Sequence, residues 1–166
     1  MRDRVRLFEA VVTPTALYGS STWALTKSME HQLFATRRRI LRYVFRIHRR
    51  RVGEDADAME DWVDFVRRAA HRVDELSAEM GMDDWINIYR KRKWRFAGKQ
   101  ARAEDGRWSQ KVLQWRTEGY TRDPGRPKTR WADQIERFAG GDWMTLALDE
   151  DRWDFLTECF ANADDV

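Results

Sequence analysis

The sequence predicts an all-α protein built as one or more helical bundles, with five to seven helices and short loops. Three observations predict this class. Proline and glycine are sparse, at three and nine of 166 residues. Alternation of β-branched and polar residues is nearly absent, and apolar residues recur at steps of three and four. A hydrophobic content of 42% also permits a packed core and argues against a disordered chain.

The first two helices are predicted from a proline and a capping residue. A helix over 2–12 is expected to end before Pro14, because proline cannot continue it. Gly19 then interrupts the chain. Ser28 is the expected N-cap of a second helix that runs through Ile47. The apolar face of this helix is formed by Leu33, Leu41 and Val44.

A third helix is predicted from a heptad-like seam that follows Met59. The seam consists of Trp62, Val66, Ala69, Val73, Leu76 and Met80. Gly81 is its expected C-cap. At about three heptads the seam is short for an independent coiled coil, so we expect it to pack within the chain.

Asp83 is expected to open a fourth helix that Gly106 ends. Its apolar face contains Ile86, Tyr89, Trp94, Ala97 and Ala101. A short helix with Trp108, Val112 and Trp115 on one face and a loop over 119–127 follow. The last predicted elements are a short amphipathic helical segment that ends at Gly140 and a helix that Asp149 or Asp151 caps. Their inward residues are Trp131, Ile135, Phe138, Trp153, Leu156 and Phe160.

The net charge of +3 hides four blocks of alternating sign. Residues 1–52 carry +9, residues 53–85 carry −8, residues 86–131 carry +10 and residues 132–166 carry −8. The two basic blocks could meet a polyanion, and the acidic blocks could neutralise them within the chain or face away from them.

Residues for catalysis or metal binding are missing from the pattern. Cys159 is the one cysteine and has no histidine nearby in the sequence, the three histidines show no paired ligand spacing, and no glycine-rich phosphate loop occurs. We therefore expect no catalytic residues, no metal and no cofactor. No apolar run approaches the ~20 residues of a membrane span, and no signal peptide is recognisable, so an intracellular protein without a membrane partner is expected.

The basic and aromatic content suits binding to a phosphate backbone. The candidate residues are Arg37, Arg38, Arg39, Arg42, Arg46, Arg90, Lys91, Arg92, Lys93, Arg95, Arg126, Lys128 and Arg130. Arginines over several helical turns would release counterions and bind without sequence specificity. The alternative is a pair of solvated helices whose arginines pair with the acidic blocks. The run 90–93 also fits a nuclear-localisation signal, which would place the protein in the nucleus.

The loop over 123–131, DPGRPKTRW, is the most distinctive local string. An arginine between glycine and proline is extended and could enter a narrow minor groove, with Lys128 and Arg130 on the bordering phosphates. The alternative is a rigid linker that leads into the next helix, capped by Thr129 and anchored by Trp131.

Several strings resemble one family. Leu17 to Thr26 (LYGSSTWALT), followed by Arg37 to Arg42 (RRRILR), resembles the segment just after the palm of LINE-type (non-LTR) retrotransposon reverse transcriptases. Arg92 to Gly98, Val112 to Trp115 and Gly125 to Trp131 look like the C-terminal extension of the same proteins, in the same order.

The charge blocks, the helix pattern and the resemblance together divide the chain into three segments: a thumb-like basic segment over 1–52, an acidic then basic helical hairpin over 53–118, and a loop with a C-terminal helical extension over 119–166. A thumb in that family grips the template-primer duplex. The family's catalytic carboxylates lie in the palm, upstream of this region. Ala163 to Asp165 mimics their motif at the other end of the chain, and we interpret it as a decoy.

The expected partners are therefore RNA, DNA or an RNA–DNA hybrid, together with a reverse-transcriptase palm. Polymerisation by this chain alone is not expected. Arg37, Arg38, Arg42 and Arg46 would follow one backbone, while 90–95 and 126–130 hold a neighbouring strand. Two alternatives stay open: a helical interaction module whose charge blocks neutralise each other, and a decayed transposon remnant without function.

Overall fold

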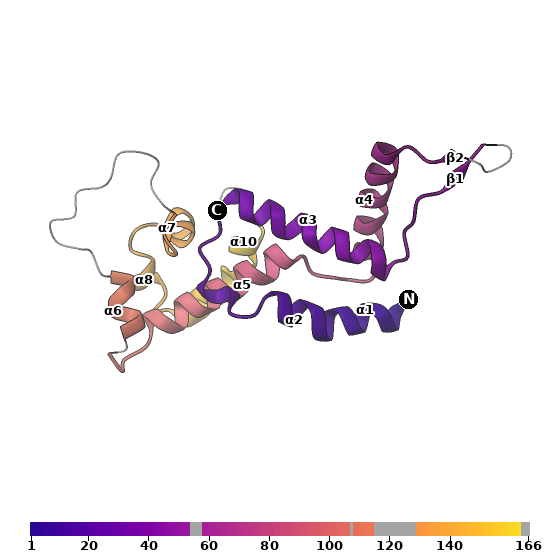
Figure 1. The fold of residues 1–166 in the computed structure, drawn as a ribbon. Helices are drawn as coiled ribbons and strands as arrows, with labels where there is room; N and C mark the ends of the chain where they lie inside the picture. Colours follow the sequence, from indigo (N-terminus) through magenta and orange to yellow (C-terminus); the bar gives the residue numbers. More distant parts are fainter. Residues whose placement is uncertain (54–57, 107, 115–128, 164–166) are drawn as a thin grey trace, which may run out of the picture. The chain divides into compact units, whose positions relative to one another are not determined.

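The computed structural model describes residues 1–53, 58–106, 108–114 and 129–163 (Figure 1). The predicted all-α class is confirmed, because most of the regular structure in the described residues is helical. The strands among these residues are two residues long each and form one antiparallel pair. The chain divides into two compact units. Unit 1 contains Met1–Tyr18 and Glu30–Trp85, and unit 2 contains Gly19–Met29 and Ile86–Val166. The three segments drawn from the sequence stay a prediction.

The described elements are divided between the two units. Unit 1 holds α1 (Arg2–Leu7), the π-helix η1 (Phe8–Val12), α2 (Thr13–Ala16), most of α3 (Lys27–Val44), β1 (Arg51–Val52), β2 (Ala58–Met59) and α4 (Trp62–Glu79). Unit 2 holds the 3-10 helix η2 (Ser20–Thr22), α5 (Trp85–Ala101) after its first residue, α6 (Trp108–Gln114), α7 (Asp133–Ala139), α8 (Trp143–Leu146), α9 (Glu150–Phe155) and α10 (Thr157–Ala161).

The first helical segment passes through Pro14 and ends at Ala16, so the prediction that it stops before the proline is wrong. Ahead of the proline the helix widens into η1, where the N–H of Thr13 donates to the carbonyl of Phe8. Pro14 then stands in the first turn of α2. A proline is tolerated there because the π-turn has already changed the hydrogen-bond pattern that its ring would break.

Helix α3 differs from its prediction at both ends. It begins at Lys27, and the hydroxyl of Thr26 accepts a hydrogen bond of 3.3 Å from the N–H of Met29. Thr26 therefore takes the capping role predicted for Ser28. The helix ends at Val44, three residues before the predicted end.

Helix α4 keeps its predicted C-terminus but not its whole predicted seam. Asp61 caps it by accepting from the N–H groups of the two residues that follow Trp62, and Gly81, with φ 65°, follows its C-terminus as predicted. Trp62 and Val66 are 58% and 38% exposed, so their placement in the core was wrong. The buried stripe is Phe65, Ala69, Val73, Leu76 and Ser77.

Trp85 closes the core of unit 1. Its indole stacks on the ring of Phe8, with centroids 5.8 Å apart, and its N–H donates to the hydroxyl of Thr13 at 3.0 Å. The side chain is 1% exposed. A residue from the start of α5 therefore fixes the N-terminal helical segment.

The core of unit 2 is built around Trp94 of α5 and Trp153 of α9. Their rings stack with centroids 3.8 Å apart, and each indole N–H donates to the backbone carbonyl of the other residue, at 2.8 and 3.0 Å. Both side chains are completely buried. Gly98 allows this packing, because a Cβ there would lie 2.5 Å from the Trp153 indole nitrogen.

Other parts of unit 2 are confirmed or corrected. Ile135 is buried, Gly140 ends α7, and Asp149 caps α9, all as predicted. The predicted last helix is divided into α9 and α10 at Leu156. On α6, Trp108 and Val112 are 77% and 56% exposed, so the face that they share is not buried, and Trp115 lies outside the described residues.

Candidate nucleic-acid interface

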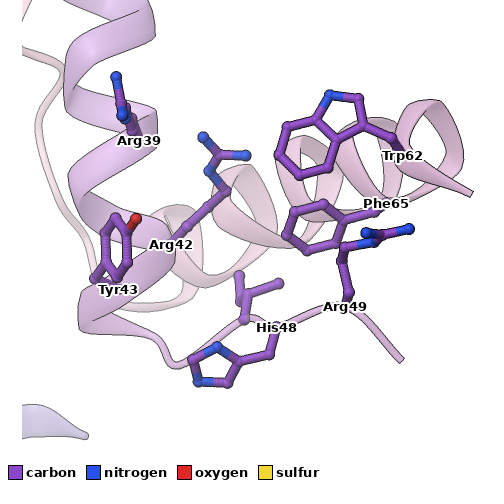
Figure 2. A pocket seen from close by; sticks show the side chains of 8 residues that line it. Arg39, Arg42, Tyr43, His48, Arg49, Trp62 and Phe65 are labelled. Atoms are coloured by element: carbon purple, nitrogen blue, oxygen red, sulfur yellow. The ribbon is translucent and has the colours of Figure 1, made fainter. Parts of the chain in front are cut away.

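Unit 1 contains a pocket of about 530 Å³ that combines arginines with aromatic rings. It lies between the C-terminal turns of α3, the segment that follows α3, and the first turn of α4. Figure 2 shows the guanidinium of Arg42 lying between Arg39 and Tyr43 on one side and the rings of Trp62 and Phe65 on the other. The lining residues are Arg39, Arg42, Tyr43, Ile47, His48, Arg49, Trp62 and Phe65.

The shape of this pocket depends on how α3 ends. The N–H of Ile47 donates to the carbonyl of Arg42 at 2.9 Å, and the N–H of Arg46 donates to the carbonyl of Tyr43 at 3.1 Å. This is the Schellman pattern, which requires a left-handed residue that is usually glycine. Here the left-handed residue is Arg46, with φ 55°. The turn carries the chain from α3 to His48 and Arg49 at the pocket.

We expect the Arg46→Gly variant to be more stable than the wild type by about 0.5–1 kcal/mol, because glycine adopts a positive φ without a Cβ clash. The same variant should bind nucleic acid more weakly, because an exposed cation beside the pocket is lost. Urea denaturation and a binding titration on one preparation would measure both effects. Arg46→Ala, which keeps the strained backbone, is the matched control, and a stability equal to that of Arg46→Gly would contradict the argument.

The segment after α3 is held by Glu60. Its carboxylate accepts from Arg68 at 2.8 and 2.6 Å and from the N–H of Arg50 at 3.2 Å, and its carbonyl accepts from the guanidinium of Arg49. Arg68 also donates to the carbonyl of His48 at 3.0 Å. These bonds position His48 and Arg49 relative to α4. The hydrogen bonds from Arg68 lower the pKa of Glu60 to about 2.

The lowered pKa predicts a pH-dependent contribution to the stability of unit 1. Because the folded pKa of about 2 lies below the ordinary 4.5, the pair stabilises the fold fully above about pH 4.5 and less as the pH falls through 2. The wild type should therefore be more stable than Glu60→Gln at pH 7, and this difference should shrink at acidic pH. Urea denaturation of both proteins across this range tests it. A difference independent of pH would contradict the assignment.

Two of the aromatic side chains that line the pocket, Tyr43 and Trp62, are accessible to solvent, whereas Phe65 is buried. Tyr43 is 71% exposed and Trp62 is 58% exposed. The guanidinium carbon of Arg49 lies 5.8 Å from the centroid of the Trp62 ring, and that of Arg42 lies 5.9 Å from the centroid of Phe65. Such cation–π contacts hold the arginine heads at the rings while leaving donors for a ligand.

The pocket is electropositive in the described part of the chain. Among the described residues no carboxylate lies within salt-bridge distance of Arg39, Arg42, Arg46 or Arg49. The carboxylate of Glu60, which accepts from the N–H of Arg50 in this segment, is paired with Arg68 at 2.6 Å. The arrangement therefore offers several cations and two accessible ring faces to an anionic ligand.

A smaller hollow of about 250 Å³ lies along the same two helices. It shares Arg39 and Arg42 with the pocket and is otherwise mostly apolar. Arg38 lies at its edge, over the ring of Phe34 at 4.2 Å, and its guanidinium pairs with Asp74 of α4. Arg38 therefore contributes to the packing of α3 on α4.

Arg37 lies in the interior, unlike its neighbours on α3. Its side chain is 4% exposed, donates to the carbonyl of Asp83 at 3.0 Å and lies 3.7 Å from the carboxylate of Asp84. Burial lowers the pKa of its guanidinium, and Asp84 partly offsets this. A phosphate cannot reach this side chain in the folded protein, so we do not include Arg37 in the interface.

The basic run on α5 is also partly internal. Lys93 is completely buried and donates to Gln134 at 2.7 Å, and Arg90 donates to the carbonyls of Ala161 and Ala163. These two side chains support unit 2 and are likewise left out of the interface. Lys91 pairs with Glu158 at 3.0 Å, Arg92 is half-buried and Arg95 is exposed.

The remaining predicted residues come from the loop before α7. Arg126 and Lys128 lie outside the described residues, so their role stays a prediction. Arg130 is exposed, and its backbone N–H donates to Asp133 at 2.7 Å. The residues that sequence reasoning missed are Tyr43, His48, Arg49 and the exposed face of Trp62. Asp61 was the available signal for Trp62, since a residue directly after an N-cap lies at a helix end.

No cluster of histidine, cysteine or acidic residues within the described ranges could hold a metal ion. No helix in the described part of the chain is both long and apolar enough to cross a membrane.

Comparison with known proteins gives one relative of stated origin. An uncharacterized transposon-derived protein of Caenorhabditis elegans is 31% identical over 159 residues, which cover 90% of this chain and 52% of that protein. The chain thus spans about half the length of this relative. The similarity indicates a transposon-related origin. No protein-family model matches the chain, and no solved structure matches it.

Proposed function

We propose that this chain is a nucleic-acid-binding part of a transposon-derived reverse transcriptase of the LINE type, and that it grips RNA, DNA or their hybrid without polymerising by itself. One observation carries the proposal. Arg39, Arg42 and Arg49 line the pocket of unit 1, and Arg46 is exposed in the turn that leads from α3 to it. Within the described residues no carboxylate lies within salt-bridge distance of these four arginines.

The spacing of these arginines suits a phosphate backbone. Arg39 and Arg42 lie one helical turn apart, a rise of about 5 Å, and Arg46 and Arg49 extend the row beyond the end of α3. Each arginine can donate two parallel hydrogen bonds to one phosphate. Contacts of this kind are strong at low salt and do not depend on base sequence.

The origin of the chain supports the same proposal. The strings that resemble the thumb and C-terminal extension of LINE-type reverse transcriptases run along most of the sequence. The relative is described as transposon-derived, which is compatible with that resemblance. The proposed role assigns α3 to the gripping surface, with the polymerase carboxylates supplied by a palm.

A second candidate function is a protein-interaction module with self-neutralised charge. Arg38 pairs with Asp74, Lys91 with Glu158, and Arg102 with Glu150, so each basic block has ion pairs to the acidic block that follows it. This pairing does not reach the arginines of the pocket, which is why we place it second.

Fluorescence anisotropy at about 50 and 200 mM salt separates the two functions. The labelled probes are an RNA–DNA hybrid, duplex DNA and single-stranded RNA. If about four phosphates are contacted, affinity should fall about 100-fold between the two salt concentrations. The double variant Arg39→Glu/Arg46→Glu should weaken binding at least tenfold and reduce the salt slope by about two.

Arg67→Glu/Arg152→Glu is the matched control, with the same change of charge at exposed sites that do not line the pocket. Arg67 follows Phe65 by two residues and so lies on the other side of α4. Equal losses in the two double variants would contradict a local interface. No binding of the wild type at the lower salt would overturn nucleic-acid binding and favour the interaction module.

A further inference from the structure

We propose that the pocket of unit 1 holds an unpaired base of a single-stranded segment, with Trp62 as its stacking surface. This inference rests on the proposed nucleic-acid binding and specifies its substrate: a strand with unpaired bases, in preference to a blunt duplex.

The volume and the aromatic lining of the pocket favour a base over a bare phosphate. At about 530 Å³ it falls within the range of small-molecule sites, which hold aromatic ligands of nucleobase size and larger. A lone phosphate needs only a few converging donors and no apolar walls. Here two of the lining side chains are Trp62 and Phe65, whose ring centroids are 5.5 Å apart.

Trp62 is held in a position where it can receive a base. It is the first residue of α4, directly after the capping Asp61, and Phe65 supports its ring from one turn further on. The indole remains 58% exposed. A large aromatic side chain held by its neighbours and left open to solvent is typical of platforms that stack bases.

The cations around the ring would bind the backbone of the same strand. The guanidinium of Arg49 lies over the Trp62 ring, and that of Arg42 extends from α3 toward the ring of Phe65 (Figure 2). Arg39 lies one turn earlier on α3. A base that is stacked within a duplex cannot present its face to a pocket, so only an unpaired or extruded base fits this arrangement. Sites that bind single-stranded nucleic acid typically combine aromatic rings, on which bases stack, with cationic side chains that contact the backbone.

The test uses the full chain and three labelled probes: a single strand of about 12 nucleotides, the same strand with abasic sites in place of its bases, and a blunt duplex. The wild type should bind the intact strand more tightly than the abasic strand. Trp62→Ala should weaken binding to the intact strand by about 10-fold or more, from the loss of one stacking contact. It should leave binding to the duplex and to the abasic strand within about twofold.

Two further variants control this result. Trp62→Phe keeps an aromatic face and should recover most of the affinity for the intact strand. Trp108→Ala removes another exposed tryptophan, in unit 2, and should leave the affinity for all three probes unchanged.

A strand with one 2-aminopurine gives a direct readout of stacking. Its fluorescence emission should fall when the base stacks against Trp62 in the wild type, and should not fall in Trp62→Ala. Circular dichroism of each variant checks that the fold is kept.

The outcomes separate this inference from the proposed function. Binding of all three probes with equal affinity, or an equal loss for all of them in Trp62→Ala, would overturn the base pocket and leave the arginine interface intact. Binding of an acidic peptide with the same dependence on Trp62 would also overturn it, because recognition would then not require a base. Failure to bind any nucleic acid would overturn both proposals.

Discussion

Replacing Trp94 by alanine is expected to destabilise unit 2 by about 3–5 kcal/mol, the usual range for a buried tryptophan. Trp94 is completely buried and contacts three other rings. It stacks on Trp153 at 3.8 Å and meets Phe160 and Phe138 at 4.6 and 5.4 Å. The variant also leaves the carbonyl of Trp153 without its indole donor. Urea denaturation followed by circular dichroism measures the loss.

The matched control for this prediction is Trp108→Ala, because Trp108 is 77% exposed on α6. Its free energy of unfolding should stay within about 0.5 kcal/mol of the wild type, as for most surface substitutions. A loss below about 1 kcal/mol in Trp94→Ala would show that unit 2 does not depend on this ring cluster.

Replacing Arg37 by alanine is expected to cost about 2–3 kcal/mol of stability, although the residue belongs to an arginine-rich run. The guanidinium is 4% exposed and binds the carbonyl of Asp83 and the carboxylate of Asp84. Its removal leaves a cavity and breaks the contact between α3 and the segment that precedes α5. Asp84 is 24% exposed, so its carboxylate can be hydrated, and the loss stays below that of a fully buried pair.

Arg39→Ala is the comparison on the same helix. We expect it to change stability by less than about 0.5 kcal/mol and to weaken nucleic-acid binding, because Arg39 is exposed and lines the pocket. Thermal or urea denaturation of both variants, with a binding titration of each, completes the test. Equal stability of the two variants would contradict the structural role of Arg37.

Helix positions were predictable from local chemistry where the signal was a cap or a break. Gly81, Gly140 and Asp149 end or begin helices in the structure as their residue types predict. Pro14 misled because its effect depends on the helix before it, and a π-turn there removes the conflict. The pattern of single residues cannot show such a turn.

The direction in which each arginine points was much harder to predict. Arg37 and Arg39 are two positions apart on one helix, which turns them to opposite sides. Both carry the same charge within one run of three arginines, and the packing of α3 decides which one is buried. On α5, Arg90 and Lys93 are buried because α10, the residues directly after it and α7 supply carbonyl and amide oxygens for them. Those partners are more than 40 residues away in sequence.

The pocket itself could be predicted only in part. Arg39 and Arg42 were identified from the basic run on α3, whereas Arg49 and Trp62 come from the segment after it and from the start of α4. The heptad seam predicted that Trp62 is buried. Steps of three and four residues fit Trp62 and Phe65 equally well, so the spacing alone does not show which of the two faces the core. The structure buries Phe65 and leaves Trp62 open.

The burial of Lys93 provides a chemical probe of unit 2. Its amine has no exposed surface and donates to Gln134 and to the hydroxyl of Tyr89. An acylating reagent can therefore modify Lys93 only when α5 and α7 separate, whereas the exposed Lys99 on the same helix reacts at all times. The ratio of the two labelling rates, read by mass spectrometry, reports how often unit 2 opens in the native protein.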